Sequence, residues 1–203
     1  MKQLLAQGAE AKTYRQGDLV FKERFVKTYR HKQVDDALRS LRTKRECTVL
    51  QKLADAAIAV PQVHVSKEDF VVVMDYIDAP RLRDELLNYP SEFSLISLAG
   101  TLLAKMHNLG IIHGDYTTSN ILVRSKHPAD IVLIDFGLSF FSTKIEDMAV
   151  DIHLAFQAFQ STHYTHAQEY ERIFLDSYTN NSTQSEDIFQ RLKTVRLRGR
   201  NKH

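Results

Sequence analysis

Several residue types that mark particular protein classes are scarce in this 203-residue chain. It has one cysteine, no tryptophan, 7 glycines and 4 prolines. The single Cys47 excludes an internal disulfide framework and a cysteine-based zinc motif, which favours a reducing compartment. The few glycines and prolines argue against collagen-like, linker-rich and turn-rich all-β chains. No apolar run approaches the ~18 residues of a membrane-spanning helix, and the N-terminus lacks a secretory pattern, so we expect a cytoplasmic or nuclear protein without membrane contact.

The overall composition is that of a folded chain, but its charge is unevenly distributed. Hydrophobic residues make up 43% and charged residues 26%, which fits one domain or two small lobes with a packed core. The net charge of +2 hides a basic segment 1–52 (net +7), an acidic segment 53–190 (net −11) and a basic end 191–203 (net +6). Basic ends of this kind suggest a polyanionic partner.

Hydrophobic periodicity predicts strands mainly in the first third of the chain and helices mainly in the rest. We expect strands at 19–25, 70–74, 121–123 and 131–134, and helices at 34–54, 92–109 and, as two or three pieces, within 146–195. The segment 75–80 reads as a connector. The predicted fold is therefore α+β and two-lobed, a single domain over 1–203 with an N-lobe of about 1–75, a C-lobe of about 80–195 and a basic tail at 195–203.

The densest chemical signal is the segment HGDYTTSN at 113–120. Its spacing is that of the catalytic loop of protein kinases, with Gly114 where arginine is usual. Asp115 could accept a hydroxyl proton, and the carbonyl of Asn120 could hold magnesium. Asp135 follows an apolar run and opens the sequence Asp-Phe-Gly, which is the context of the second magnesium ligand. The pair of motifs predicts phosphoryl transfer from ATP with Mg²⁺.

Two upstream residues and one loop complete this prediction. Lys22 lies on a predicted strand, where a kinase places the lysine that contacts the ATP phosphates, and Glu46 on the next helix could pair with it. No triple-glycine loop precedes Lys22, but Gln7, Gly8, Ala9, Glu10 and Ala11 occupy its position. Small residues there still allow backbone N–H groups to approach phosphate.

The sequence after Gly137 lacks a typical platform for peptide substrates. Few residues separate Gly137 from the next predicted helix, and no Ala-Pro-Glu motif follows. This absence favours ATP hydrolysis, autophosphorylation or a substrate supplied by a tightly bound partner.

The motifs together resemble the small atypical kinase of the KEOPS (EKC) complex, the PRPK family. The resemblance covers nearly the whole chain and rests on QGAEA at 7–11, FKERFVKTYRH at 21–31, HGDYTTSN at 113–120, DFGLS at 135–139, EDMAVDIHLAFQAFQSTH at 146–163 and VRLRGRNKH at 195–203. It implies a minimal protein-kinase-like fold with a small strand-rich N-lobe and a reduced helical C-lobe.

The resemblance also implies roles for individual residues. Asp115 would be the catalytic aspartate, Asn120 and Asp135 would hold magnesium, and Lys22 would contact ATP and pair with Glu46. Residues 7–11 would cover the phosphates, and Met74, Tyr76 and Ile77 would flank adenine. The implied partners are the threonylcarbamoyl-transferase subunit, a small subunit bound to the N-lobe, and tRNA, towards which the tail residues Arg196, Arg198 and Arg200 would reach. The implied activity is ATP hydrolysis in support of threonylcarbamoyl modification of adenosine, with serine/threonine kinase activity.

Other interpretations stay open at this point. A RIO-type kinase is the nearest alternative, an aminoglycoside- or choline-type kinase a more distant one, and a non-catalytic tRNA-binding scaffold belongs to another class. The remaining chemistry-bearing residues suggest structural roles: we expect His163 and His166 at the surface, Cys47 buried in a helix, and Phe136, Phe140, Phe141, Phe156 and Phe159 in a lobe core.

Overall fold

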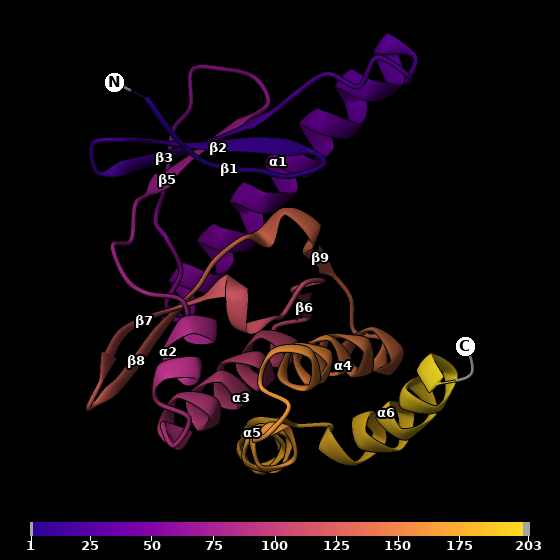
Figure 1. The fold of residues 1–203 in the computed structure, drawn as a ribbon. Coiled ribbons are helices and arrows are strands. Elements are labelled where there is room, and N and C mark those ends of the chain that lie inside the picture. Colours follow the sequence, from indigo (N-terminus) through magenta and orange to yellow (C-terminus); the bar gives the residue numbers. More distant parts are fainter. Residues whose placement is uncertain (1, 201–203) are drawn as a thin grey trace. The chain divides into compact units, whose positions relative to one another are not determined.

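The computed structural model describes residues 2–200, without the side chains of residues 199 and 200. The chain divides into two compact units, the first ending at Asp78 and the second beginning at Ala79. Figure 1 shows the strands of the first unit and the helices of the second, which follow in chain order. No helix in the described part of the chain is long and apolar enough to cross a membrane.

The first unit is built on an antiparallel sheet with strand order β1-β2-β3-β5-β4. Its strands are β1 (Gln3–Gln7), β2 (Ala11–Gln16), β3 (Leu19–Arg24), β4 (Val63–His64) and β5 (Val71–Asp75). β3 lies between β2 and β5, and every second residue of β3 is buried. Because side chains alternate between the two faces of a strand, Val20, Lys22 and Arg24 share the buried face.

Helix α1 (Lys32–Asp55) completes the first unit and contacts β4 and β5. Its buried side changes character along the helix. The part of the helix up to Glu46 buries the ionic Asp35, Arg39 and Glu46, and the part after it buries the apolar Val49, Leu50 and Leu53. The helix therefore anchors on an apolar core at one end and presents ionic side chains to β3 at the other.

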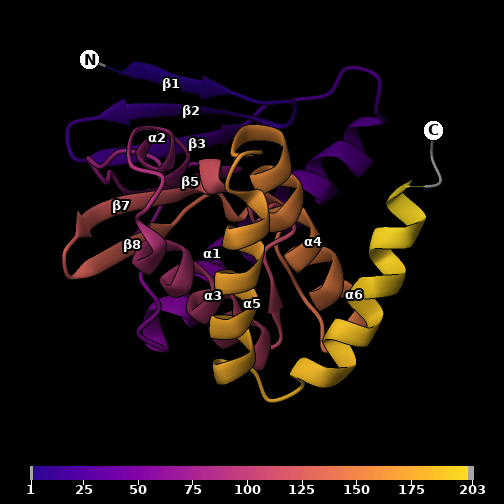
Figure 2. The same ribbon diagram turned by 60° about the horizontal axis from the view of Figure 1, so that its bottom comes forward.

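The second unit is mainly helical. Its helices are α2 (Leu82–Asn88), α3 (Phe93–Asn108), α4 (Ile145–Thr162), α5 (Ala167–Asn181) and α6 (Ser185–Arg200), with single 3₁₀ turns η1 (Thr118–Asn120) and η2 (Phe136–Leu138). The short strands β6 (Ile111–Ile112) and β9 (Phe140–Phe141) pair, as do β7 (Ile121–Lys126) and β8 (Ala129–Leu133). Helix α3 packs against α5 and α4 against α6, as Figure 2 shows.

An aromatic cluster forms the core of the helical unit. The rings of Phe156, Phe159 and Phe174 lie 5.9–6.3 Å from one another between centroids, and Tyr170 and Tyr116 extend the cluster. The prediction of a core role is confirmed for Phe136, Phe156 and Phe159, which are at most 1% exposed. It is wrong for Phe141, which is 45% exposed, because the two-residue strand β9 leaves this side chain at the surface.

Candidate active site

Lys22 and Glu46 form a buried ion pair in the first unit. Nζ of Lys22 donates a 2.6 Å hydrogen bond to Oε1 of Glu46, and Nη2 of Arg24 lies 2.5 Å from Oε2 of the same carboxylate. All three side chains are less than 10% exposed. One carboxylate therefore compensates two buried cations, and its removal would cost about 3–5 kcal/mol in unfolding free energy. The predicted pair is present, and Arg24 joins it.

The loop predicted to cover the phosphates connects β1 to β2. Gln7 is the last residue of β1 and Ala11 the first of β2. The N–H of Gly8 donates to the carbonyl oxygen of Ala11 at 2.9 Å, and the ammonium of Lys27 donates to the carbonyl oxygen of Ala9. This loop is thus a short turn with its own internal contacts rather than an open glycine-rich flap.

Asp115 and Asn120 lie side by side in the second unit, Asp115 in the loop between β6 and η1 and Asn120 at the end of η1. The amide nitrogen of Asn120 donates to the main-chain oxygen of Asp115 at 2.9 Å and to its Oδ2 at 2.8 Å. Both contacts use the amide nitrogen, so the side-chain carbonyl of Asn120 is not needed for them. The arrangement fixes the Asp115 carboxylate and leaves an oxygen of Asn120 suited to a cation.

Asp135 is held against the same loop by the residue before it. The N–H of Ile134 donates to the main-chain carbonyl oxygen of Asn120 at 3.0 Å. The main-chain oxygen of Ile134 lies 3.2 Å from Nε2 of His113. Asp135 itself has φ 63°, a left-handed conformation that is uncommon for aspartate, and its side chain is exposed. Such backbone strain recurs at functional sites, where surrounding contacts maintain it.

His113 fills the space beneath the loop. Its ring lies 4.7 Å from the ring of Phe136 and 5.5 Å from that of Tyr116, between centroids. Burial lowers the pKa of His113 and outweighs the opposing effect of Asp151, Asp135 and Asp115. At neutral pH the His113 side chain is therefore a neutral imidazole packed against the rings of Phe136 and Tyr116.

The carboxylate of Asp151 on α4 accepts hydrogen bonds from two backbone N–H groups of the segment 113–120. Its Oδ2 accepts the N–H of His113 at 2.6 Å and its Oδ1 the N–H of Gly114 at 2.9 Å. Nε2 of His107 lies 3.3 Å from Oδ2, and Nδ1 of His107 lies 2.6 Å from the hydroxyl of Tyr178. Asp151 is fully buried. It is a functional residue that the sequence analysis missed, although a lone acid in the apolar run MAVDIHLAF was a usable signal.

The residues predicted to flank adenine lie at the end of β5 and just after it. Met74 is buried in the strand, and the N–H of Tyr76 donates to the carbonyl oxygen of Asp18 at 2.8 Å. The guanidinium of Arg15 lies 3.7 Å from the centre of the Tyr76 ring. Ile77 follows with a half-buried side chain. Their contact with adenine stays a prediction.

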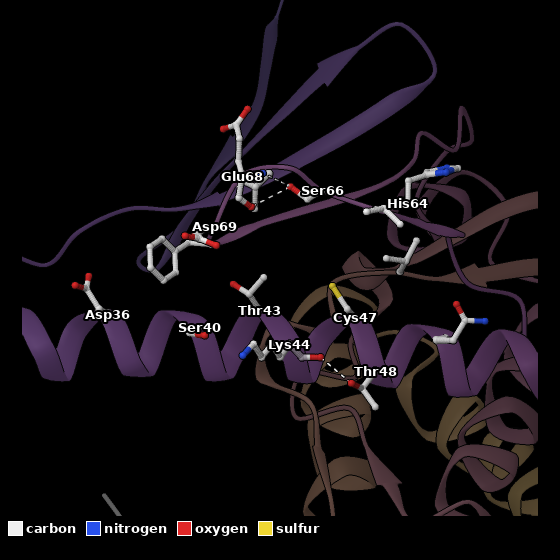
Figure 3. A pocket seen from close by; sticks show the side chains of 15 residues that line it. Asp36, Ser40, Thr43, Lys44, Cys47, Thr48, His64, Ser66, Glu68 and Asp69 are labelled. Carbon is white, nitrogen blue, oxygen red and sulfur yellow. Dashed lines mark hydrogen bonds between the residues drawn. The ribbon is translucent and has the colours of Figure 1, made fainter.

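The first unit also carries an open groove, of about 860 Å³, between α1 and the segment around β4 and β5. Figure 3 shows Thr43 and Cys47 rising from α1 towards this segment. The hydroxyl of Thr43 is buried without a hydrogen-bond partner in the described part of the chain. None of the residues predicted to bind nucleotide lines the groove, so it is not the predicted ATP site. Cys47 lines it half-buried, and burial raises its thiol pKa, which argues against a nucleophile.

In the helical unit the structure differs from two further expectations from the sequence, for His163 and for the C-terminal region. His163 was expected at the surface but is 4% exposed, because it ends α4 under the ring of Tyr170 at 5.8 Å. The region from residue 195 was expected to be a tail, but helix α6 runs to Arg200. Arg196 pairs with Glu171 at 2.8 Å and Arg198 with Glu146 at 2.9 Å. The side chain of Arg200 and residues 201–203 lie outside the described part.

The structure thus assembles the predicted site residues as two groups. The first unit joins Lys22 to Glu46, and the second joins Asp115 and Asn120 to the strand end that carries Asp135. No group of three histidine, cysteine, aspartate or glutamate side chains in the described part of the chain could hold a metal ion. Magnesium usually binds through one or two carboxylates together with phosphate and water. The oxygen donors of Asn120 and Asp135 fit that requirement.

Comparisons with known proteins agree with this geometry. The RIO domain family matches residues 4–173. The EKC/KEOPS complex subunit Tp53rkb of Mus musculus is 40% identical, over 98% of this chain and 86% of the mouse protein. A probable bifunctional tRNA threonylcarbamoyladenosine biosynthesis protein of Methanosarcina barkeri is 34% identical, over 98% of this chain and 35% of that protein. The Rio2 kinase-ADP/Mg²⁺-phosphoaspartate complex from Chaetomium thermophilum has a TM-score of 0.65 at 16% identity, over 98% of this chain and 70% of that one.

These similarities confirm the fold and the family expected from the sequence. The likeness to Rio2 shows the α+β, kinase-like fold. The sequence analysis set a RIO-type kinase against a KEOPS-type kinase as alternatives, but the chain matches both the RIO domain and KEOPS subunits, so the two do not exclude each other. The chain belongs to the RIO domain family, in the group that includes the EKC/KEOPS complex subunit Tp53rkb.

Proposed function

We propose that this chain is a Mg²⁺- and ATP-dependent kinase or ATPase that acts as a KEOPS subunit and supports threonylcarbamoyl modification of tRNA. The observation that carries the proposal is the contact between Asn120 and Asp115, with Asp135 held beside them through Ile134. A scaffold without catalysis does not require this arrangement. The names of the mouse and archaeal relatives support the KEOPS and tRNA parts.

Each unit carries residues to which we assign a role in phosphoryl transfer. Asp115, steadied by Asn120, orients the attacking hydroxyl or water and accepts its proton. Lys22, steadied by Glu46, contacts the phosphates and offsets their charge. The side-chain oxygens of Asn120 and Asp135 would hold magnesium, which supplies charge neutralisation at the transferred phosphate. Asp151 and His113 keep the loop in position.

The short connection after Asp135 bears on the phosphate acceptor. Only the 3₁₀ turn η2 and the two-residue strand β9 separate Asp135 from α4. This stretch offers no extended peptide-binding platform, which supports water or a partner-held group as the acceptor. The partners we propose are the threonylcarbamoyl-transferase subunit, a second small subunit on the first unit, and tRNA.

The proposal is tested by ATP hydrolysis of the purified full chain with Mg²⁺, alone and with the threonylcarbamoyl-transferase subunit and tRNA. We expect turnover that rises with the partner and tRNA and that falls by at least about 100-fold in Asp135→Asn and Asp115→Asn. Lys105→Gln, which removes a charge from α3, serves as the surface control.

Three results would overturn parts of the proposal. Hydrolysis that survives unchanged in both aspartate variants would show that the assigned residues are not catalytic. Absence of hydrolysis, with labelled phosphate appearing on protein instead, would replace the ATPase by a protein kinase. Absence of both, with tRNA binding retained, would favour the scaffold.

A further inference from the structure

Glu10 places a carboxylate in the loop that is proposed to cover the ATP phosphates, directly before β2. Each of its oxygens meets an arginine: Oε2 lies 2.9 Å from Nη1 of Arg42, and Oε1 accepts a 3.3 Å hydrogen bond from Nη2 of Arg30. Arg42 is a residue of α1, and Arg30 lies just before that helix. The loop is therefore connected through Glu10 to the helix that carries Glu46.

The remaining contacts of the loop leave its donors available for an anion. The carbonyl oxygen of Ala9 accepts from Lys27, and that of Ala11 accepts from the N–H of Gly8. The backbone N–H groups of Ala9 and Glu10 donate to no group in the part of the chain that the structure describes. Two consecutive N–H groups of this kind are the donors with which a turn binds phosphate.

The arginines also remove an electrostatic conflict. An unpaired carboxylate in a phosphate-covering loop would repel the triphosphate, since like charges a few ångströms apart disfavour each other. With Arg30 and Arg42 on its two oxygens, the group of three side chains carries a net positive charge. Partial burial opposes ionisation of Glu10, but the hydrogen bonds from Arg42 and Arg30 outweigh this and lower its pKa.

A continuous series of polar contacts connects Glu10 to the catalytic ion pair. Arg30 lies 3.6 Å from the buried Asp35, Asp35 accepts from Arg39 at 2.8 Å, and Arg39 donates to the carbonyl oxygen of Arg24 at 3.4 Å. The series then reaches Glu46 and Lys22 through the side chain of Arg24. All of these residues belong to the first unit.

We propose that Glu10 is a positioning residue for nucleotide binding, which uses Arg42 and Arg30 to hold the loop Gln7–Ala11 in a shape that presents its N–H groups to phosphate. An ion-paired carboxylate then replaces the mobile glycines of an ordinary kinase loop. This inference rests on the proposed function, because it takes Mg-ATP as the ligand. The position of the loop itself, however, is a property of the chain without nucleotide.

The first experiment tests that position directly, by hydrogen exchange of the Gly8 N–H, which donates to the carbonyl oxygen of Ala11, in the full chain without nucleotide. Loss of a partly exposed ion pair should raise the exchange rate of this amide by about threefold to fivefold in Arg42→Gln. Arg45→Gln is the matched control, since it removes a positive charge from the same helix and Arg45 forms no ion pair among the described residues. Equal exchange in the two variants would overturn the proposal.

The second experiment measures the KM for Mg-ATP and the affinity for Mg-ADP. Arg42→Gln should raise both constants about threefold to fivefold with kcat changed less than about twofold, because the loop binds phosphate but does not react. An unchanged KM in Arg42→Gln, or a fall in kcat alone, would overturn the role of Glu10.

The two experiments separate this inference from the function on which it rests. A wild-type chain that binds no Mg-ADP would overturn the proposed function and the nucleotide role of Glu10 together. Normal binding by the wild type, with Arg42→Gln indistinguishable from Arg45→Gln in exchange and in KM, would overturn the role of Glu10 alone.

Discussion

Gly114 stands where a kinase catalytic loop usually carries arginine, and its surroundings account for the difference. Its φ is +81°, a conformation that side chains with a Cβ rarely adopt. A Cβ built on it would lie 2.6 Å from the carbonyl oxygen of Leu138, which follows the Asp-Phe-Gly sequence. The catalytic loop and the segment after Asp135 therefore approach each other too closely for any residue but glycine.

We predict that Gly114→Ala lowers the free energy of unfolding by about 2–4 kcal/mol. Left-handed strain contributes about 1–2 kcal/mol and the overlap with Leu138 about as much again. Urea unfolding followed by circular dichroism measures the loss. Gly17→Ala is the control, because Gly17 has φ +62° but nothing within 4 Å of its Cβ position. Equal losses in the two variants would contradict the close approach at Leu138.

His163 is a second residue whose chemical behaviour is set by its buried surroundings. It is 4% exposed, and its Nε2 is buried without a hydrogen-bond partner among the described residues. Burial lowers its pKa, and the positive charges of His166 and Arg83 lower it further. The folded chain therefore binds a proton at His163 less readily than the unfolded chain does.

The sign of this shift predicts a loss of stability in acid. Because the folded pKa lies below the unfolded value of about 6.5, the free energy of unfolding falls as the pH drops below 6.5 towards the folded pKa. Urea unfolding at about pH 7.5 and about pH 5.5 measures this change in the free energy of unfolding. Burial also lowers the pKa of His113 and of His153, so these two residues contribute to the change in the same direction. His163→Phe should show a smaller change. An NMR titration midpoint of His163 at or above 6.5 would contradict the prediction.

At the scale of elements, helix α4 matters because it carries the anchor of the catalytic loop. Asp151 accepts two backbone N–H groups of that loop and also contacts His107 of α3, which in turn contacts Tyr178 of α5. Three helices thus converge on one buried carboxylate. The loop is held by secondary structure that lies elsewhere in the sequence, not by its own residues alone.

We predict that Asp151→Asn lowers the free energy of unfolding by about 2–4 kcal/mol, because an amide cannot accept both N–H groups as a carboxylate does. ATP turnover should fall by at least about tenfold, since Asp115 loses its position. Tyr178→Phe is the control, because it removes the 2.6 Å contact with His107 but leaves Asp151 and the N–H groups that it accepts unchanged, and it should cost about 1 kcal/mol with turnover nearly unchanged. Full turnover in a destabilised Asp151→Asn would contradict the anchoring role.

The elements that the sequence predicted are those with a clear burial pattern. β3, β5, α1 and α3 were placed within a few residues, because β3 alternates buried and half-buried residues, β5 is a continuous apolar run, and the two helices bury apolar residues at helical spacing. β1 was missed because all of its residues are exposed, and β4, β6 and β9 because a two-residue strand exists only through its partner. Asp115 and Asn120 were found because their spacing is local, whereas Asp151 acts across 37 residues on Gly114.

At the scale of the whole molecule, part of the positive charge of the basic end 191–203 is neutralised by acidic side chains of the helical unit. Arg191 and Arg198 of the basic end both pair with Glu146 of the acidic segment, at 3.0 Å and 2.9 Å. Arg196 pairs with Glu171 and lies 5.3 Å from the ring centre of Phe156. The composition predicted a free basic tail because periodicity and net charge do not reveal which opposite charges meet after folding.

These ion pairs predict how the basic end responds to a polyanion such as tRNA. If RNA binds there, it competes with Glu146 for Arg191 and Arg198, so Glu146→Gln should raise RNA affinity by about twofold to fivefold, the range expected for exposed ion pairs. The gain should shrink at high salt, because both the pairs and the phosphate contacts are screened. Filter binding or fluorescence anisotropy with tRNA measures the affinity of the full chain.

Glu186→Gln is the matched control, since Glu186 is exposed at the start of α6 and forms no ion pair among the described residues. It removes the same charge from the molecule without freeing an arginine. A gain in Glu146→Gln that exceeds the gain in Glu186→Gln therefore reports the release of Arg191 and Arg198 rather than a change in net charge. Equal gains would place the RNA contact elsewhere and leave these arginines with the structural role of fastening α6 to α4.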